Sequence, residues 1–232
     1  MSVESEKKAA AEAALKFIKS GQRVGLGTGT TANYFIAALA AKVKQEKWDI
    51  QCVATSNATQ ELGIKLGLKM SSLEELPFLD LTVDGADEFD AGFRLIKGGG
   101  GAMHREKIVA ASSQWMVVIA DHSKQVKTLG KFPLPVEVSK MGVKATAWKI
   151  ERAFKHLNLQ GKMILRLQNG APFVTEAGNY IVDCHLGAIP DAEKLDGYLN
   201  NTPGVIESGI FIGICGIILM GTEKGVTEFV KK

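Results

Sequence analysis

Short apolar segments of strand length alternate with helical segments along the first half of the chain. The strand-like segments are residues 24–27, 50–56, 79–85 and 115–120, and the helical ones include 4–19, 31–43 and 58–66. Parallel strands need a crossover between them, so this β-α-β order predicts an open, mostly parallel, Rossmann-like α/β sheet. Between two of these segments, Ser71 and Glu74 have the spacing of a capping box.

The pattern changes after the apolar segment 132–138. It is followed by an amphipathic helix at 145–157, a strand at 162–167, a hairpin at 173–184 and a helix at 192–199. This order is typical of a smaller α+β unit. We predict a catalytic α/β domain of residues 1–129 plus 205–232, with an inserted α+β domain of residues 130–204 and the strands of 206–220 returning to the first sheet.

Charge and composition indicate a small-molecule partner. The 232 residues are 46% hydrophobic, and 28 Lys and Arg balance 25 Asp and Glu to a net charge of +3, which argues against a nucleic-acid-binding surface. The three cysteines have no metal-ligand spacing, so we expect buried thiols and a cytoplasmic location. The N-terminus lacks an apolar signal segment, and the apolar run 210–221 is shorter than the roughly 18 residues of a membrane span.

A glycine-rich loop, GLGTGTTA, follows the first strand and opens the next helix. Such a loop offers backbone N–H groups and the positive end of a helix dipole to an anion. A dinucleotide fingerprint needs glycine at position 30, which is Thr, and no Gly-Lys-[Ser/Thr] follows. The loop Thr28, Gly29, Thr30 and Thr31 therefore suits a phosphate monoester, although an ordinary strand-to-helix turn with a threonine N-cap explains it equally well.

Two carboxylates follow the strand at 79–85. Asp84 lies at its carboxyl end, Gly85 and Ala86 keep the turn small, and Asp87 comes next. Open α/β sheets hold their ligands at this edge, where paired carboxylates can bind sugar hydroxyls or transfer protons. A solvated acidic turn is the alternative. We predict no metal here, because D-x-x-D has no further ligands at calcium-loop spacing.

Four glycines, Gly98–Gly101, precede a short helical segment. They let a ligand lie against bare backbone, with Lys97 entering the loop and Glu106 following on the first turns of the helix. A solvated helix face with Arg105 and Lys107 beside Glu106 is the alternative explanation.

Five motifs together resemble ribose 5-phosphate isomerase A over nearly the whole chain: GLGTGTTA, TSNATQELG, DGADEFD, IKGGGGAMHREK and ADHSKQVKTLGKFPLPVEV. The resemblance implies interconversion of ribose 5-phosphate and ribulose 5-phosphate without a metal or other cofactor. It also implies a cytosolic homo-oligomer, a homodimer or a homotetramer.

The resemblance also implies roles for individual residues. Glu106 would be the general base that moves a proton between C2 and C1, and Lys97 would lie beside the enediolate oxygen. Asp84 and Asp87 would handle ring opening and hydroxyl positioning. The substrate-binding set would be Lys7, Thr28, Gly29, Thr30, Thr31, Asp84, Gly85, Ala86, Asp87, Lys97, Gly98, Gly99, Gly100 and Lys124.

Two other functions compete with the isomerase. A related sugar-phosphate deaminase or lactonase would need a different catalytic set, and a lactonase would lack the pairing of Glu106 with Lys97. A non-catalytic sugar-phosphate sensor would need a DNA-binding helix-turn-helix, but one helical segment alone precedes the first strand.

Overall fold

The computed structural model describes residues 2–231, and these form two compact units. The first unit comprises the described residues of Met1–Ala86, Arg105–Gln125 and Gly213–Lys232. The second comprises Asp87–His104 and Val126–Ile212. The predicted catalytic domain of residues 1–129 plus 205–232 and the predicted inserted domain of residues 130–204 stay predictions.

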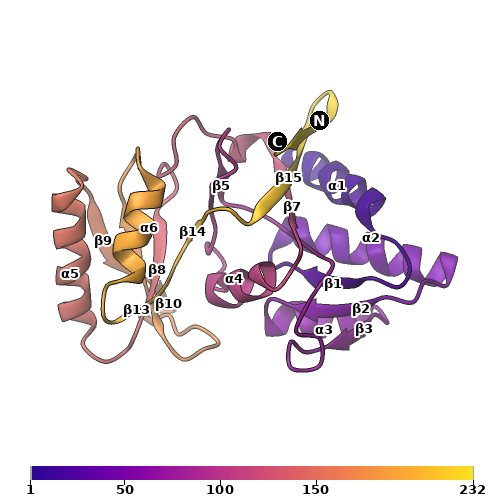
Figure 1. The fold of residues 1–232 in the computed structure, drawn as a ribbon, viewed down its shortest axis with the longest axis horizontal. Coiled ribbons are helices and arrows are strands. Elements are labelled where there is room, and N and C mark those ends of the chain that lie inside the picture. Colours follow the sequence, from indigo (N-terminus) through magenta and orange to yellow (C-terminus); the bar gives the residue numbers. More distant parts are fainter. Residues whose placement is uncertain (1, 232) are drawn as a thin grey trace. The chain divides into compact units, whose positions relative to one another are not determined.

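The first unit is built on a seven-stranded sheet in the order β16-β15-β7-β4-β1-β2-β3 (Figure 1). Its strands are β1 (Arg23–Leu26), β2 (Gln51–Ala54), β3 (Lys69–Ser71), β4 (Leu81–Asp84), β7 (Met116–Asp121), β15 (Cys215–Thr222) and β16 (Gly225–Val230). All neighbours pair in parallel except β15 and β16, which form an antiparallel hairpin. The predicted α/β class with a mostly parallel sheet is confirmed.

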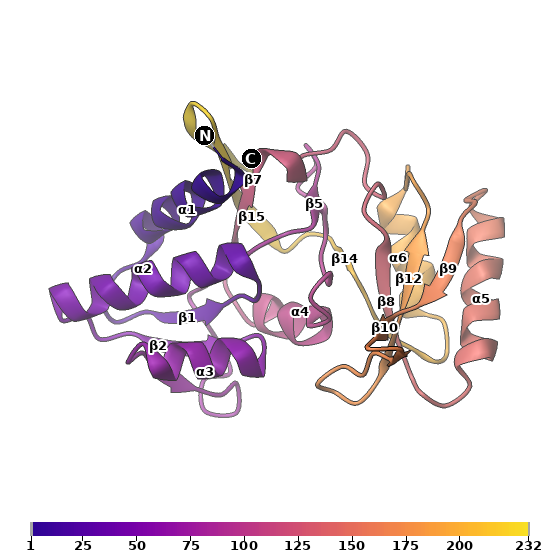
Figure 2. The same cartoon turned by 180° about the vertical axis from the view of Figure 1, so that it is seen from behind.

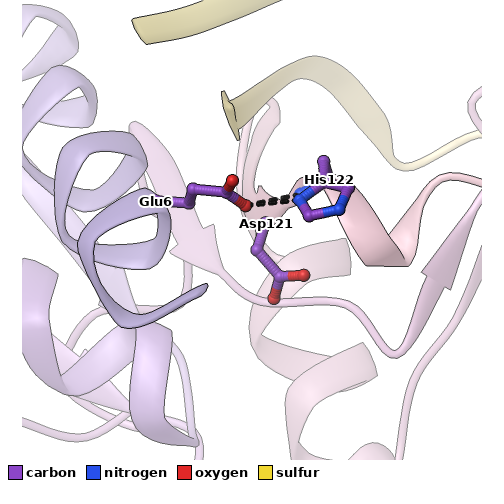
Figure 3. Close-up of side chains that lie close together, drawn as sticks. All are labelled: Glu6, Asp121 and His122. Carbon is purple, nitrogen blue, oxygen red and sulfur yellow. Dashed lines mark hydrogen bonds and ion pairs between the residues drawn. The ribbon is translucent and has the colours of Figure 1, made fainter. Parts of the chain in front are cut away.

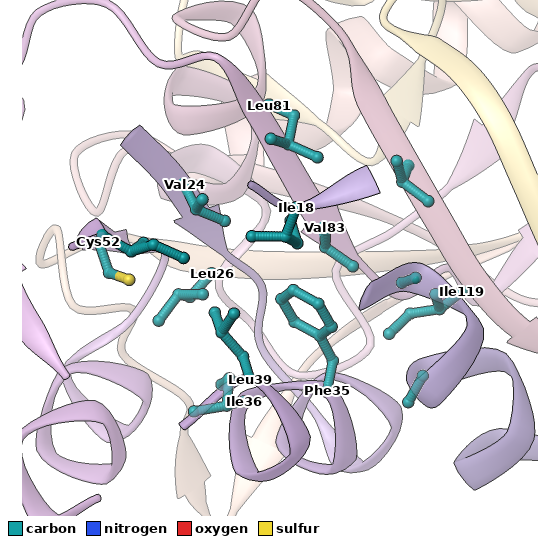
Figure 4. Packing of buried hydrophobic residues seen from close by; sticks show 14 of the residues in the cluster. Ile18, Val24, Leu26, Phe35, Ile36, Leu39, Cys52, Leu81, Val83 and Ile119 are labelled. Atoms are coloured by element: carbon teal, nitrogen blue, oxygen red, sulfur yellow. The ribbon is translucent and has the colours of Figure 1, made fainter. Parts of the chain in front are cut away.

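The helical segments of this unit are α1 (Val3–Ala13), η1 (Ala14–Phe17), α2 (Thr30–Glu46), α3 (Asn57–Lys65), α4 (Met103–Ala111) and η2 (His122–Lys124). In Figures 1 and 2, α1 and α2 cover one face of the sheet and α4 lies on the other. Phe35 and Leu39 of α2 pack on Val24 and Leu26 of β1 (Figure 4). This apolar layer fixes the start of α2 at the carboxyl edge of the strands.

Residues that alternate with this layer point to the opposite face. Val53 of β2 packs there with Val109 of α4. Gly25 faces the same side, where a Cβ would lie 1.9 Å from Oγ1 of Thr82 and 2.9 Å from a methyl of Val109. Glycine at position 25 therefore lets α4, which carries Glu106, approach the sheet closely.

The second unit holds three small antiparallel sheets. They are β13-β8-β12-β9, β14-β6-β5 and β10-β11. Their strands are β5 (Glu88–Phe89), β6 (Leu95–Ile96), β8 (Leu134–Val138), β9 (Lys162–Leu165), β10 (Leu167–Gln168), β11 (Ala171–Pro172), β12 (Tyr180–His185), β13 (Val205–Ser208) and β14 (Ile210–Phe211). The amphipathic helices α5 (Val143–His156) and α6 (Ala192–Asn200) bury their apolar faces against the four-stranded sheet.

Three local predictions are wrong in whole or in part. The turn of the predicted hairpin at 173–184 forms, with the N–H of Thr175 donating to the carbonyl of Asn179 at 2.9 Å, but residues 173–175 are not a strand, and β12 pairs with β8 and β9. Of the segment 206–220, the end from Cys215 alone joins the first sheet, while β13 pairs with β8 and β14 with β6. The reciprocal hydrogen bonds of a capping box join Ser72 and Glu75, one residue beyond the predicted pair.

The cysteines are free and buried as predicted. Burial raises the pKa of Cys52 and of Cys215 to about 12, so neither thiol ionises near neutral pH. Among residues 2–231, no helix has both the length and the apolarity to cross a bilayer.

Candidate active site

The glycine-rich loop of the first unit ends at the start of α2. Gly29 is the N-cap residue with φ of +111°, and no side chain caps the helix. The first N–H groups of α2, at Thr30 and Thr31, are therefore not taken by a capping side chain, and both residues lie at least partly exposed. This geometry is compatible with an anion, and the binding of phosphate here stays a prediction.

Thr28 differs from its two neighbours, because its hydroxyl is already engaged. Its Oγ1 lies 2.7 Å from Oγ1 of Thr55, 2.8 Å from Oγ of Ser56 and 3.2 Å from Oγ1 of Thr59. This hydroxyl cluster ties the loop to the start of α3. Thr55, Ser56 and Thr59 are not among the predicted site residues, although the repeated Ser and Thr of this segment are a signal for such a cluster.

Asp84 is the last residue of β4 and is fully buried. Its Oδ1 accepts hydrogen bonds from the N–H of Thr28 at 3.1 Å and of Gly85 at 2.7 Å. A Cβ at position 27 would lie 2.1 Å from the same oxygen, so only glycine permits this approach. The structure thus brings the predicted phosphate loop and Asp84 together at the carboxyl edge of the sheet.

Glu106 lies in the first turn of α4, and 4% of its surface is exposed. A solvated helix face was the alternative interpretation, and this burial excludes it. A carboxylate near a helix N-terminus also interacts favourably with the helix dipole.

The two lysines predicted to assist phosphate binding belong to different helical segments, α1 and η2. Lys7 of α1 places Nζ 2.7 Å from Oε1 of Glu4, whose Oε2 accepts a hydrogen bond from the Tyr34 hydroxyl of α2 at 2.8 Å. The hydrogen bonds from Lys7 and then Tyr34 lower the pKa of Glu4. Lys124 closes η2, directly after the carboxyl end of β7, and is partly exposed.

One group in the described part of the chain could offer three metal ligands. Glu6, Asp121 and His122 each have a donor atom, and these atoms lie within 4.8 Å of one another (Figure 3). Oε2 of Glu6 is already hydrogen-bonded to the His122 ring, and Oδ1 of Asp121 accepts from the N–H and hydroxyl of Ser123. The group leaves no local sequence pattern, because Glu6 is far from Asp121 and His122 in the chain.

The four-glycine loop of the second unit is a tight turn. Gly98 and Gly101 have φ of +103° and +81°, which other residues rarely adopt. The N–H of Gly99 donates to Oδ2 of Asp87 at 2.7 Å, and a Cβ at position 99 would lie 2.7 Å from the other oxygen. Asp87 therefore lies directly against the loop.

Lys97 enters this loop with 3% of its surface exposed. Its N–H donates to the carbonyl of Gly209 at 2.9 Å, and its Nζ lies 5.6 Å from the centre of the Phe211 ring. Pairing of β14 with β6 brings these partners to Lys97. Gly209 is required there, because a Cβ would lie 2.4 Å from the Lys97 carbonyl oxygen.

The comparisons with known proteins agree on one family. The profile of ribose 5-phosphate isomerase A (phosphoriboisomerase A) matches residues 51–225. The protein named ribose-5-phosphate isomerase A of Parvibaculum lavamentivorans is 51% identical over 226 residues, which cover 97% of each chain. Its namesake in Brucella suis is 51% identical over 216 residues, covering 93% of each chain.

Solved structures give the same answer. The ribose 5-phosphate isomerase of Plasmodium falciparum superposes with a TM-score of 0.93 at 34% identity, covering 99% of both chains. A D-ribose-5-phosphate isomerase in complex with phospho-erythronic acid superposes with a TM-score of 0.92 at 38% identity over all of both chains. With half of its residues identical to curated members over almost its full length, this chain belongs to the ribose 5-phosphate isomerase A family of isomerases.

Proposed function

We propose that this protein interconverts D-ribose 5-phosphate and D-ribulose 5-phosphate through an enediolate, with Glu106 as the base that moves a proton between C2 and C1. Family membership supports the isomerase over a sugar-phosphate sensor, deaminase or lactonase. The observation that carries the residue assignment is burial. Charged side chains are rarely buried, yet Asp84, Lys97 and Glu106 are each at most 4% exposed.

The reaction needs a base, a way to open the sugar ring and a stabiliser for negative charge. Glu106 removes the proton on one carbon and returns it to the neighbouring carbon. Asp84 and Asp87 act on the sugar hydroxyls and open the ring. Lys97 and the N–H groups of Gly98 and Gly100 stabilise the enediolate oxygen, which carries charge only after proton removal, while the N–H of Gly99 donates to Asp87.

The phosphate lies at the start of α2 in this proposal. The N–H groups of Gly29, Thr30 and Thr31 and the two threonine hydroxyls bind it, with charge supplied by Lys7 and Lys124. Thr28 contributes by holding the loop, since its hydroxyl is engaged with Thr55, Ser56 and Thr59. Gly85 and Ala86 keep the turn that joins the two carboxylates small.

A ligand bound to a relative supports these positions for the phosphate and for the enediolate oxygen. Its structure was solved with phospho-erythronic acid, a four-carbon sugar acid phosphate. This ligand carries a planar carboxylate at one end and a phosphate at the other, like an enediolate phosphate. We propose that the present protein binds it in the same way, needs no cofactor, and works as a cytoplasmic homodimer or homotetramer.

Substitution of Glu106 tests the proposal. Glu106→Gln keeps the shape but removes the base, so we expect kcat to fall about 10²- to 10⁴-fold with a small change in KM. Glu61→Gln is the matched control, because Glu61 is an exposed carboxylate on α3. Activity of Glu106→Gln within a few-fold of the control would refute the assignment.

Hydrogen transfer gives a second test. A carboxylate base exchanges the abstracted proton with solvent, whereas a hydride shift between carbons does not. We expect turnover in D₂O to place deuterium on the carbon that receives the proton, as measured by NMR of the product. Turnover without label, and without label washing into the substrate, would argue against Glu106 as an exchanging base.

A further inference from the structure

An arginine outside all the recognised motifs contacts the glycine loop. Arg166 lies between β9 and β10 in the second unit. Its Nε and Nη2 donate to the two carboxylate oxygens of Asp183 on β12, at 2.9 and 2.5 Å. The third nitrogen, Nη1, donates to the carbonyl of Gly98 at 2.9 Å and to that of Gly99 at 3.2 Å.

The guanidinium is held firmly in this position. The N–H of Arg166 donates to Ile181 and its carbonyl accepts from Phe173, both at 2.8 Å. The Phe173 ring lies 5.9 Å from the guanidinium carbon, and it also touches the loop, since a Cβ at position 101 would lie 2.5 Å from its Cζ. The Arg166 side chain is only 15% exposed. Backbone, carboxylate fork and ring together leave it little freedom.

The two carbonyl contacts determine where the loop N–H groups point. A trans peptide unit is planar, so its C=O and N–H point in opposite directions. With the carbonyls of Gly98 and Gly99 turned toward Arg166, the N–H groups of Gly99 and Gly100 point away from it. The first of these meets Asp87 at 2.7 Å. Arg166 thereby aligns Asp87 and the loop donors together.

We propose that Arg166, oriented by Asp183, is a positioning residue of the isomerase. It holds the Gly98–Gly99 and Gly99–Gly100 peptide units so that their N–H groups serve Asp87 and the enediolate oxygen. This inference rests on the proposed function, in which the loop stabilises the enediolate. It adds Arg166 and Asp183, neither of which has a role in the reaction proposed above.

An arginine is needed because the contact uses three nitrogens in a rigid plane. A lysine at position 166 would keep the charge, but its single ammonium cannot span the Asp183 carboxylate and two carbonyls in the same geometry. Misplacement of reacting groups by about 1 Å can cost about 100-fold in rate. We therefore expect kcat of Arg166→Lys to fall about 10- to 100-fold, with KM within about three-fold of wild type.

Two inhibitors separate positioning from general damage. Phospho-erythronate probes the loop and the phosphate site together, whereas inorganic phosphate probes the phosphate site alone. By calorimetry, we expect the affinity of Arg166→Lys for phospho-erythronate to fall about as much as kcat, with unchanged affinity for phosphate. Asp183→Asn should show the same pattern more weakly. Arg152→Lys, an exposed arginine of the same unit, is the control.

The outcomes distinguish this inference from the function on which it rests. Wild-type kcat in Arg166→Lys, or equal loss of affinity for both inhibitors, would overturn the positioning role. If Arg166→Lys remains active while Glu106→Gln is inactive, the positioning inference fails alone. If Glu106→Gln remains active, the proposed function fails, whereas selective loss of phospho-erythronate affinity would still support the alignment of the loop by Arg166.

Discussion

The ring of His122 and the carboxylate of Glu6 lie 2.6 Å apart, measured from Nδ1 to Oε2. The pair joins α1 to the turn after β7 (Figure 3). Glu6 is buried while more than half of the His122 side chain is exposed. The hydrogen bond to Glu6 and then its charge raise the pKa of His122, and the charges of Asp121 and Glu223 act in the same direction.

This pair should make stability depend on pH. A histidine with a raised pKa in the folded state contributes stability that is fully present below its unfolded pKa, about 6.5, and is lost as pH rises through the folded pKa. We therefore expect His122→Gln to lower the urea midpoint clearly near pH about 6 and less near pH about 9. Urea titrations of both proteins across this range measure the effect.

A double-mutant cycle provides the control. Glu6→Gln combined with His122→Gln should show a coupling between the two positions that shrinks as pH rises. An equal loss of stability at both pH values would mean that packing of the ring, rather than its charge, supports the fold.

Glu6 and His122, together with Asp121, form a group of three possible metal ligands among the described residues. Metal removal therefore tests directly whether the reaction needs an ion. We expect prolonged treatment with EDTA to leave isomerase activity unchanged, since none of the proposed roles uses an ion. Activity that is lost and then restored by a divalent cation would contradict the metal-free mechanism. Repeating the experiment with His122→Gln would then show whether the ion acts through this group.

Sequence periodicity was sufficient to predict the parallel sheet and the strand ends that carry Asp84 and the phosphate loop. Short buried strands and the helices between them leave a strong pattern, because burial on both faces selects apolar runs. Glu106 and Lys97 were found through motifs. Their burial could not be predicted, because it depends on how closely α4 approaches Gly25 and on the contact of Gly209 with Lys97.

Two of the three errors share one physical cause, which is strand pairing between distant segments. The segments 173–175 and 180–184 alternate like a hairpin, but β12 pairs instead with β8 and β9. Arg166 was missed for the same reason: its contacts with Gly98, Gly99 and Asp183 join residues that are remote in sequence. Local patterns contain no information on such contacts.

Thr31 tests the phosphate site. Thr31→Val removes one hydroxyl at the start of α2 but keeps the shape of the side chain. We expect KM for ribose 5-phosphate to rise about 10-fold with kcat little changed, and inhibition by inorganic phosphate to weaken in parallel, because ground-state binding is lost. Thr227→Val in β16 is the control, since Thr227 is exposed and Val suits a strand. Unchanged phosphate inhibition would place the phosphate elsewhere.

Gly100 differs from the other glycines of its loop. Gly98 and Gly101 need a positive φ, and Gly99 leaves space for Asp87. At Gly100 neither reason applies, because its φ lies outside the left-handed region and a Cβ would meet nothing within 4 Å. If the protein itself does not require glycine at this position, the ligand is the remaining reason for it.

This difference predicts opposite effects of two alanine substitutions. Gly100→Ala should change the free energy of unfolding by no more than about 0.5 kcal/mol, yet lower kcat/KM at least about 10-fold, because the new methyl group occupies space needed by the sugar. Gly98→Ala should instead lower the free energy of unfolding by about 1 kcal/mol or more, since position 98 has φ of +103° and its Cβ would lie 2.7 Å from the sulfur of Met103.

Gly197→Ala on α6, where a Cβ also meets nothing within 4 Å, controls for the added methyl group and should leave activity unchanged. Urea unfolding and steady-state kinetics measure the two quantities separately. Full activity in Gly100→Ala would mean that the substrate does not lie against this part of the loop.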